Sequence, residues 1–342
     1  MPEKILVRAT NWVGDVVMAT PALAAIRKNF KDAKVSLLIK PPLQDMLAGD
    51  PAVDEFIIYD RKGEHAGPAG LARMVRELRK RRFDRAILLQ NAFEAALVAF
   101  LAKIPVRMGY STDGRGILLT DSVKVSDETR RKHQAYYYLD MLSALGLKTN
   151  GLGMPRLYLT KDDTEYGGSF MKEHGLKKGE LLVGINPGAQ YGVAKKWHPE
   201  RFGEVADKLI KSHGAKVILF GSTADVPSAG SVEASMKGDV INMAGKTSIR
   251  ELMAIIKRLG LFITNDTGPM HISAALGVPT LAVFGSTDPV ATGPVGGVSR
   301  VVRSPVGCSP CLKRTCPQKS YICMEQVTPG QVYRAAKEML DG

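Results

Sequence analysis

The chain has 342 residues, of which 45% are apolar and 24% charged, and its net charge is +13. Because this length exceeds what one hydrophobic core fills, we expect two domains of a globular protein. No apolar run reaches the roughly 20 residues that span a bilayer, and the chain starts with a strand pattern rather than a secretion leader, so we expect a cytoplasmic protein.

Short apolar and β-branched runs alternate with helical patterns along the chain, which predicts parallel sheets with crossover helices. In the first half, strands are expected at 5–9, 35–39, 56–59, 85–89 and 106–109, and helices at 16–29, 71–81, 94–102 and 133–145. In the second half, strands are expected at 181–186, 217–220, 240–243, 261–264 and 280–284, and helices at 200–212, 228–236, 250–256 and 272–276. Thr328 suits the N-cap and Pro329 the first turn of a last helix at 329–340.

The strand pattern restarts after a turn-rich stretch at 151–155, so we predict two Rossmann-like, doubly wound α/β domains that face a central cleft. Their expected ranges are 1–160 and 161–327. Ligands of such sheets bind beyond the carboxyl ends of the strands. Turn residues stand at these ends in both halves, namely Asp15, Pro187-Gly188, Gly221, Ala244-Gly245 and Asp266-Thr267-Gly268.

The segment Asp266-Thr267-Gly268 follows an apolar strand and leads directly into a helix. The first amides of a helix have no partner within it, and the helix dipole favours an anion there. The amides of Thr267 and Gly268 are therefore candidates for binding a phosphate. The plainer alternatives are that Asp266 caps the helix and that His271 is a hydrogen-bonded structural residue on its inner face.

Asp15 follows Gly14 at the first strand-to-helix turn. It is either the N-cap of that helix or a general base facing the cleft. In the other half, Lys195 and Lys196 follow the turn at Pro187-Gly188, where a lysine can act as a point charge on a diphosphate. The alternative is that both lysines are ordinary solvated side chains. The neighbouring Trp197 is expected to anchor packing.

Several motifs are absent from the sequence. It contains no phosphate-binding P-loop, no Gly-x-Gly-x-x-Gly in its first turn and no Asp-x-Asp pair. A nicotinamide-dependent oxidoreductase and a dedicated metal–diphosphate bridge are therefore disfavoured.

All four cysteines lie close together in the spacing C-x2-C-x4-C-x6-C, formed by Cys308, Cys311, Cys316 and Cys323. Clustered thiols in a cytoplasmic chain suggest a metal site before disulfides, but only the first pair has ordinary zinc-ligand spacing. Structural zinc, a redox-labile pair and plain buried thiols all stay open. We expect a structural rather than a catalytic role.

Basic residues crowd two segments of the first half, 73–85 and 130–132. Individually they suit solvated helix faces, but seven bases in the first segment indicate an anionic partner. The sequence shows no zinc-finger or RNP-type signature, so a phosphorylated substrate or a membrane surface is favoured over nucleic acid.

Taken together, Gly14-Asp15-x5-Pro21, Pro187-Gly188, Lys195-Lys196-Trp197, Gly221-Ser222 and Asp266-Thr267-Gly268-x2-His271 resemble glycosyltransferase family 9, the bacterial lipopolysaccharide heptosyltransferases. The resemblance runs from about residue 4 to 340. Two stretches, 8–15 and 311–317, look like the heptosyltransferase II branch of the family.

The resemblance implies a GT-B fold with the acceptor on the N-terminal domain, ADP-heptose on the C-terminal one, and the helix at 328–342 packing back on the N-terminal domain. It also implies inverting transfer of L-glycero-D-manno-heptose from ADP-heptose to the first heptose of the Kdo-lipid A inner core. Asp15 matches the catalytic base, Lys195 the lysine on the donor diphosphate, and Asp266 a residue that orients the turn or contacts the donor sugar. Weaker matches place Met243 at the adenine and Asp225 at the ribose.

No cofactor is then required, with Mg²⁺ at most an optional ion. The implied partners are the donor, the phosphorylated lipid A-Kdo-heptose acceptor and the cytoplasmic face of the inner membrane, where the protein would associate peripherally. Two alternatives stay open. One is a heptosyltransferase that acts at another core position, I or III. The other is a non-catalytic nucleotide- or phosphate-binding protein that docks on nucleic acid through its basic helices.

Overall fold

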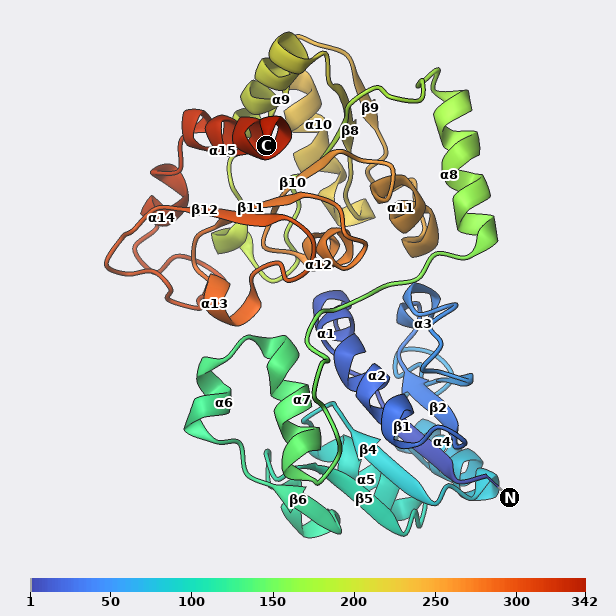
Figure 1. The fold of residues 1–342 in the computed structure, drawn as a ribbon. Helices are drawn as coiled ribbons and strands as arrows, with labels where there is room; N and C mark the ends of the chain where they lie inside the picture. The colour runs from blue at the N-terminus through green and yellow to red at the C-terminus, as the bar shows by residue number, and fades with distance from the viewer. Residues whose placement is uncertain (1) are drawn as a thin grey trace. The chain divides into compact units, whose positions relative to one another are not determined.

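A computed structural model describes residues 2–342 of the chain, which divide into two compact units between Tyr158 and Leu159 (Figure 1). Each unit contains one six-stranded, fully parallel sheet with helices around it. The prediction of an α/β protein with two doubly wound sheets is confirmed. The expected boundary at residue 160 lies close to this division.

The first sheet has the strand order β3-β2-β1-β4-β5-β6. Its strands are β1 (Lys4–Arg8), β2 (Lys34–Ile39), β3 (Glu55–Ile58), β4 (Arg85–Leu88), β5 (Val106–Tyr110) and β6 (Asp121–Val123). The helices of this unit are α1 (Val13–Met18), α2 (Thr20–Asn29), α3 (Leu43–Met46), α4 (Gly67–Arg81), α5 (Phe93–Leu101), α6 (Asp127–Arg131) and α7 (Gln134–Ala144). The order reverses between β1 and β4, which places a ligand-binding edge at the carboxyl ends of these two strands.

The helix expected at 16–29 is in fact two helices that meet at Ala19. Pro21 lies in the first turn of α2 and has no N–H to give to the carbonyl of Val17 one turn earlier. The Thr20 hydroxyl donates to that carbonyl instead, at 2.8 Å. The break follows from this proline. The short edge strand β6 was not predicted.

Glu55 on β3 is held by two basic side chains, Lys34 at 2.9 Å and Arg81. The hydrogen bond from Lys34, followed by that from Arg81, lowers the pKa of Glu55 to about 2. Because the pKa is lower in the folded protein, the ionised carboxylate stabilises the fold at pH values above the unfolded pKa of 4.5. This stabilisation is lost as the pH falls from 4.5 towards 2.

We therefore expect Glu55→Gln to lower the free energy of unfolding at neutral pH by up to about 1 kcal/mol. Chemical denaturation at a series of pH values checks this, because the difference from wild type should vanish near pH 2. Glu64→Gln removes an exposed carboxylate 3.7 Å from Arg73 and serves as the control. A difference that is independent of pH would refute the assignment.

The second sheet has the order β12-β11-β10-β7-β8-β9. Its strands are β7 (Leu182–Asn186), β8 (Lys216–Leu219), β9 (Val240–Asn242), β10 (Leu261–Asn265), β11 (Thr280–Phe284) and β12 (Ser299–Arg303). The helices are α8 (Lys161–Glu173), α9 (Pro199–His213), α10 (Val226–Ser235), α11 (Ile249–Ile256), α12 (Gly268–Ala275), α13 (Pro289–Thr292), α14 (Ile322–Glu325) and α15 (Pro329–Asp341). Here the order reverses between β7 and β10. Both strands are fully buried and end in an asparagine, Asn186 and Asn265.

Four elements of this unit were not predicted, namely α8, β12 and the four-residue helices α13 and α14. Helix α8 begins directly after the expected boundary at residue 160, where Thr160 and Asp163 form a capping box. That Thr-x-x-Asp spacing was a readable signal for a helix start. The edge strand β12 follows a glycine-rich stretch that hides its pattern.

The last helix, α15, packs on α9, β10, β11 and β12 of the second unit. Its buried residues Val332, Ala335 and Ala336 form one apolar stripe in the core of that unit. The apolar face of this helix therefore covers the second sheet, and the expected packing on the N-terminal domain stays a prediction. None of the helices between residues 2 and 342 has the length and apolarity that crossing a bilayer requires.

Candidate functional site

Asp15 lies in the first turn of α1, just beyond the carboxyl end of β1 where the first sheet reverses its strand order. The N-cap of α1 is Trp12, so the alternative in which Asp15 is the cap residue is removed. Asp15 is half-buried, and its charge helps to raise the pKa of Tyr138 on α7, after the larger effect of burial. The carboxylate is thus close to the edge at which such sheets bind ligands.

Two buried arginines stand at the same edge and were not singled out from the sequence. The guanidinium of Arg8 donates to the carbonyls of Ala9 and Leu38, both at 3.1 Å. Arg115 is fully buried and donates to the carbonyl of Tyr110 at 2.8 Å. Burial lowers the pKa of each to about 10, so both remain charged at neutral pH. They give this edge a positive potential. For Arg8, its place at the end of a buried strand was the available sequence signal.

In the second unit, Lys195 and Asp266 form an ion pair with Nζ and Oδ2 2.5 Å apart. The side chains are only 13% and 4% exposed, so the pair is largely desolvated. The Thr287 hydroxyl donates to the same carboxylate oxygen at 2.7 Å. Asp266 is not the helix cap, because Thr267 holds that position. The structure therefore brings together two residues that are 71 positions apart in the sequence.

Asn265, at the end of β10, ties three segments together next to this pair. Its side chain accepts from the Trp197 amide at 3.0 Å and donates to the Pro187 carbonyl at 2.8 Å. Trp197 itself is fully buried, and its ring N–H donates to the Val327 carbonyl at 2.9 Å. The expectation that Trp197 anchors packing is confirmed. These contacts fix the chain that carries Lys195 against the end of β10.

Asn265→Ala should lower the free energy of unfolding by about 2–4 kcal/mol, because it leaves a buried amide and a buried carbonyl without partners. Denaturant titration measures this effect, with Ser231→Ala as the control since that hydroxyl makes only an exposed hydrogen bond. A loss below about 0.5 kcal/mol, the range of ordinary surface substitutions, would contradict the role given to Asn265.

Tyr191 is a further residue of this site that the sequence did not reveal. The Lys195 ammonium lies 4.8 Å and the Arg314 guanidinium 4.9 Å from the centre of its ring. The Tyr191 hydroxyl donates to the Leu312 carbonyl at 3.3 Å. One aromatic ring thus contacts two cations, and the cysteine-bearing segment is held next to Lys195.

The remaining residues expected at the donor surround the same edge. Thr267 and Gly268 are half-buried at the start of α12, whose first amides lack a carbonyl one turn earlier. Gly188 packs against Asp225: a Cβ atom added to Gly188 would lie 2.3 Å from the carboxyl carbon of Asp225. The Asp225 carboxylate accepts from the Ser222 amide and hydroxyl, which fixes it as part of a capping box. Met243 is half-buried directly after β9.

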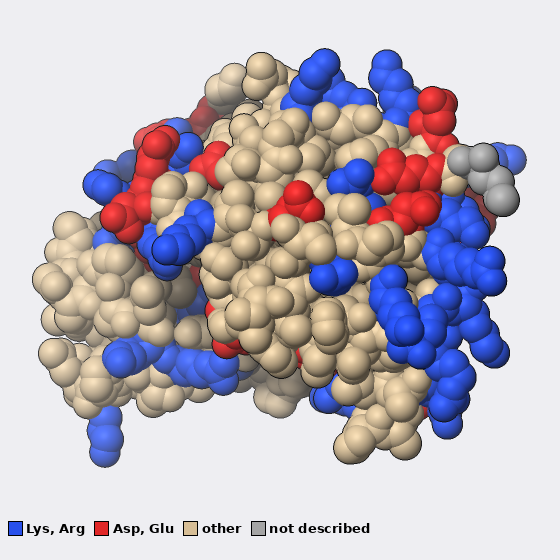
Figure 2. Space-filling view, turned by 90° about the horizontal axis from the view of Figure 1, so that it is seen from below, with Lys and Arg blue, Asp and Glu red and all other residues tan. Residues whose placement is uncertain are grey.

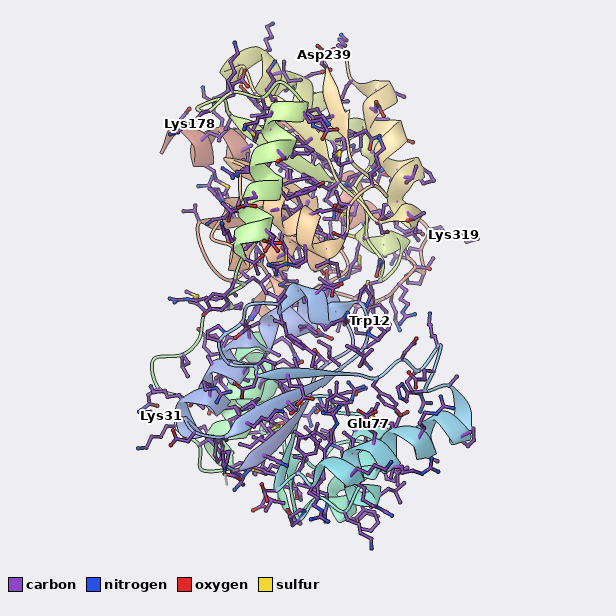
Figure 3. The ribbon with its side chains drawn as sticks, turned by 90° about the vertical axis from the view of Figure 1, so that its right-hand side faces the viewer. Trp12, Lys31, Glu77, Lys178, Asp239 and Lys319 are labelled. Atoms are coloured by element: carbon purple, nitrogen blue, oxygen red, sulfur yellow. The ribbon has the colours of Figure 1, made fainter. Side chains whose placement is uncertain are left out.

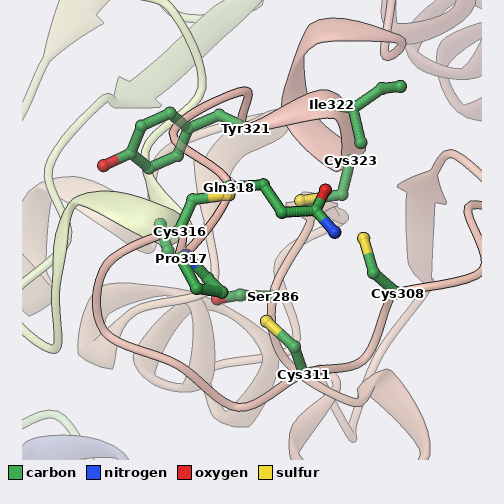
Figure 4. A pocket seen from close by; sticks show the side chains of 10 residues that line it. Ser286, Cys308, Cys311, Cys316, Pro317, Gln318, Tyr321, Ile322 and Cys323 are labelled. Carbon is green, nitrogen blue, oxygen red and sulfur yellow. The ribbon is translucent and has the colours of Figure 1, made fainter.

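The four cysteines line one hollow of about 40 Å³ in the second unit (Figure 4). All four are thiols, and they range from exposed Cys308 to buried Cys323. Between residues 2 and 342, no three Cys, His, Asp or Glu side chains are arranged to hold a metal ion. His271 is 6% exposed on α12 and has interaction partners of its own, in line with a structural role.

The basic segment at 73–85 belongs mostly to α4 and the turn after it. Several of its charges are paired with acids, as in Arg81 with Glu77 and Arg85 with Glu3. Figure 2 shows Lys and Arg gathered along one edge of the face drawn, with acidic side chains beside them. Arg76, Lys80 and Arg82 remain exposed. The cluster is therefore less strongly basic than its sequence suggests.

The profile of glycosyltransferase family 9 (heptosyltransferase) matches residues 71–322. Lipopolysaccharide heptosyltransferase 2 of Salmonella typhimurium is 30% identical to the chain over 98% of both sequences. The crystal structure of a family 9 glycosyl transferase from Veillonella parvula has a TM-score of 0.88, with 27% identity over 99% of this chain and 97% of that one. The structure of E. coli ADP-heptose LPS heptosyltransferase II has a TM-score of 0.81, with 27% identity over 98% of both chains.

Proposed function

This chain belongs to glycosyltransferase family 9, the heptosyltransferases, and we propose that it moves L-glycero-D-manno-heptose from ADP-heptose to the first heptose of the Kdo-lipid A inner core. The enzyme class follows from the family, so the alternative of a non-catalytic phosphate-binding protein is set aside. The observation that carries the proposal is the desolvated Lys195–Asp266 pair at the carboxyl ends of β7 and β10, in a chain similar to heptosyltransferase 2 over nearly its whole length.

Lys195 and the amides of Thr267 and Gly268 are assigned to the donor diphosphate. The lysine is a point charge on a loop fixed through Trp197 and Asn265, and the amides begin an eight-residue helix. Together they stabilise the negative charge that develops on the departing ADP. In this proposal no cofactor is required, and Mg²⁺ is an optional addition. Gly188, Asp225 and Met243 surround the nucleoside.

Asp15 is assigned as the general base. It takes the proton of the acceptor hydroxyl as that oxygen attacks the anomeric carbon of the donor and the bond from that carbon to the diphosphate breaks. Attack opposite the leaving group inverts the anomeric configuration. The rate enhancement comes mainly from holding the acceptor hydroxyl next to the Asp15 carboxylate.

The acceptor is proposed to be the phosphorylated Kdo-lipid A bearing one heptose, at the cytoplasmic face of the inner membrane. The buried charges of Arg8 and Arg115 favour an anionic ligand at the edge that carries Asp15. The exposed bases of α4 and its following turn are suited to anionic headgroups, each contributing about 1 kcal/mol near such a surface.

The acceptor position is tested by incubating the enzyme with ADP-heptose and a series of truncated lipid A cores, followed by mass analysis. The core that ends in the first heptose should gain one heptose, whereas Kdo-lipid A without heptose should gain none. Transfer to the heptose-free core would overturn the assigned position in favour of heptosyltransferase I. Transfer only to a core that already bears two heptoses would favour heptosyltransferase III.

A further inference from the structure

The cysteine hollow contains reactive groups that the proposed transfer does not use. It is lined by all four thiols together with Ala194, which immediately precedes Lys195, and Ser286 after β11. In Figure 4 the sulfur atoms of Cys308, Cys311 and Cys323 turn towards the space that Cys316 also lines. Four cysteines and no others in a 342-residue chain therefore meet at one small site.

The thiols of this site differ in reactivity. The pKa of Cys316 is lowered, first by a hydrogen bond from the Tyr321 backbone and then by those of Gln318 and Ser320. Burial raises the pKa of Cys323, and the nearby charges of Cys308 and Cys311 raise it further. Because the thiolate is the reacting form, half-exposed Cys316 is the nucleophile of the cluster, with other sulfurs nearby.

The segment that carries the cysteines is joined to the segment that carries Lys195. The Ala194 amide donates to the Arg314 carbonyl at 3.1 Å, and the Tyr191 hydroxyl donates to the Leu312 carbonyl at 3.3 Å. The contact is close, since a Cβ on Gly192 would stand 2.3 Å from the Arg314 carbonyl oxygen. Lys178 and Asp239 precede β7 and β9 and so mark the amino-terminal edge of the second sheet. Figure 3 shows Lys319 of the cysteine segment away from both of them. The cysteine segment thus lies at the carboxyl edge of the second sheet.

We propose that the cysteine hollow is a reversible oxidation site that reacts with small-molecule disulfides and thereby changes how the adjoining segment holds Lys195. The Cys316 thiolate attacks one sulfur of the small disulfide, the sulfur–sulfur bond breaks, and one small thiolate leaves. A second cysteine of the hollow then gives up its proton and attacks Cys316 in the mixed disulfide, releasing the other small thiolate. The two cysteines lose two electrons in total, which reduce the small disulfide to two thiols.

The consequence for the donor site is mechanical. A disulfide brings its two sulfurs to about 2.05 Å, and the 311–316 stretch, whose residues 312–315 are exposed, must shift to allow this. Leu312 and Arg314 lie in that stretch and hold Tyr191 and Ala194 through the contacts above. Oxidation therefore loosens the support of Lys195 and weakens ADP binding. This second part rests on the proposed function, whereas the oxidation itself does not.

The test treats the reduced, full-length protein with oxidised glutathione. Thiols counted under denaturing conditions should fall from four to two, the mass should drop by two hydrogens, and dithiothreitol should restore both. Peptide mapping should place Cys316 in the disulfide. Calorimetry should show ADP binding weakened about fivefold or more after oxidation. Unchanged ADP affinity would overturn the coupling to Lys195 but leave the oxidation site in place.

Three variants test the role of Cys316, and two of them keep all four cysteines. Ser320→Ala deletes a side chain that hydrogen-bonds Cys316 and should slow the loss of thiols a few-fold, whereas the exposed neighbour change Thr315→Ala should not. Cys316→Ser should slow it about tenfold or more. Equal rates in all variants would refute the proposal. So would a protein whose four thiols stay protected by a bound metal that elemental analysis detects and a chelator releases.

Discussion

Asp15→Asn is expected to abolish heptose transfer, with a loss in kcat of about 10²- to 10⁴-fold, while ADP binding stays near that of the wild type. The amide keeps the size of the side chain but cannot take a proton from the acceptor hydroxyl. Asp15 belongs to the first unit, whereas the residues assigned to ADP all belong to the second. Rates are measured with ADP-heptose and the heptose-bearing core, and ADP affinity by calorimetry.

A matched control is Asp45→Asn in α3, a half-buried carboxylate of the same unit that we assign no catalytic role. It should transfer heptose at a rate close to that of the wild type. If the Asp15 variant keeps a comparable rate, Asp15 is not the base. If it loses ADP binding as strongly as transfer, the residue acts on the fold or on the donor instead.

Lys195→Met is expected to weaken ADP binding by about 10- to 100-fold and to slow transfer as well, because the diphosphate loses a charge-assisted contact. It also leaves the Asp266 carboxylate without its cation in a site where that carboxylate is 4% exposed. Removing one partner of a buried pair costs up to about 3–5 kcal/mol. We expect a loss of stability at the lower end of this range, because Thr287 still donates a hydrogen bond to Asp266 and Lys195 is partly exposed.

A double variant separates these two effects. Adding Asp266→Asn to Lys195→Met removes the unpaired charge, so thermal stability should recover while ADP affinity stays low. Lys196→Met is the matched control, since it is the adjacent half-buried lysine with no assigned diphosphate contact. ADP affinity in the Lys195 variant equal to that in the control would remove Lys195 from the diphosphate site. Recovery of ADP affinity in the double variant would also show that Lys195 does not bind the diphosphate.

The sequence predicted the fold well because the fold depends on periodic patterns. Strands such as β7 and β10 are buried on both faces and are read as unbroken apolar runs. The residues at their carboxyl ends could be placed as ligand-binding candidates from topology alone, before any contact was known. The prediction missed the short edge strands, the short helices α3, α6, α13 and α14, and the capped helix α8, since their signals extend over few residues.

The contacts within the site were harder to predict, because they depend on which side chains meet in space. Asp266 and Asp15 both looked like helix caps, yet the cap positions belong to Thr267 and Trp12. Tyr191 looked like one loop tyrosine among several until Lys195 and Arg314 were found on its ring. The placement of α15 was taken from the resemblance, and the apolar stripe at 332–336 shows the sheet that it covers.

Lys195 has an anionic neighbour within its own unit, the carboxylate of Asp266. The two charges cancel, so chloride or orthophosphate gains little by entering from solution. If the diphosphate binds Lys195 as we propose, it must offer the ammonium a better set of oxygens than the carboxylate does. It can do so only while the other parts of the nucleotide are also held. The ion pair therefore lowers the affinity of the site for small anions that lack the rest of the nucleotide.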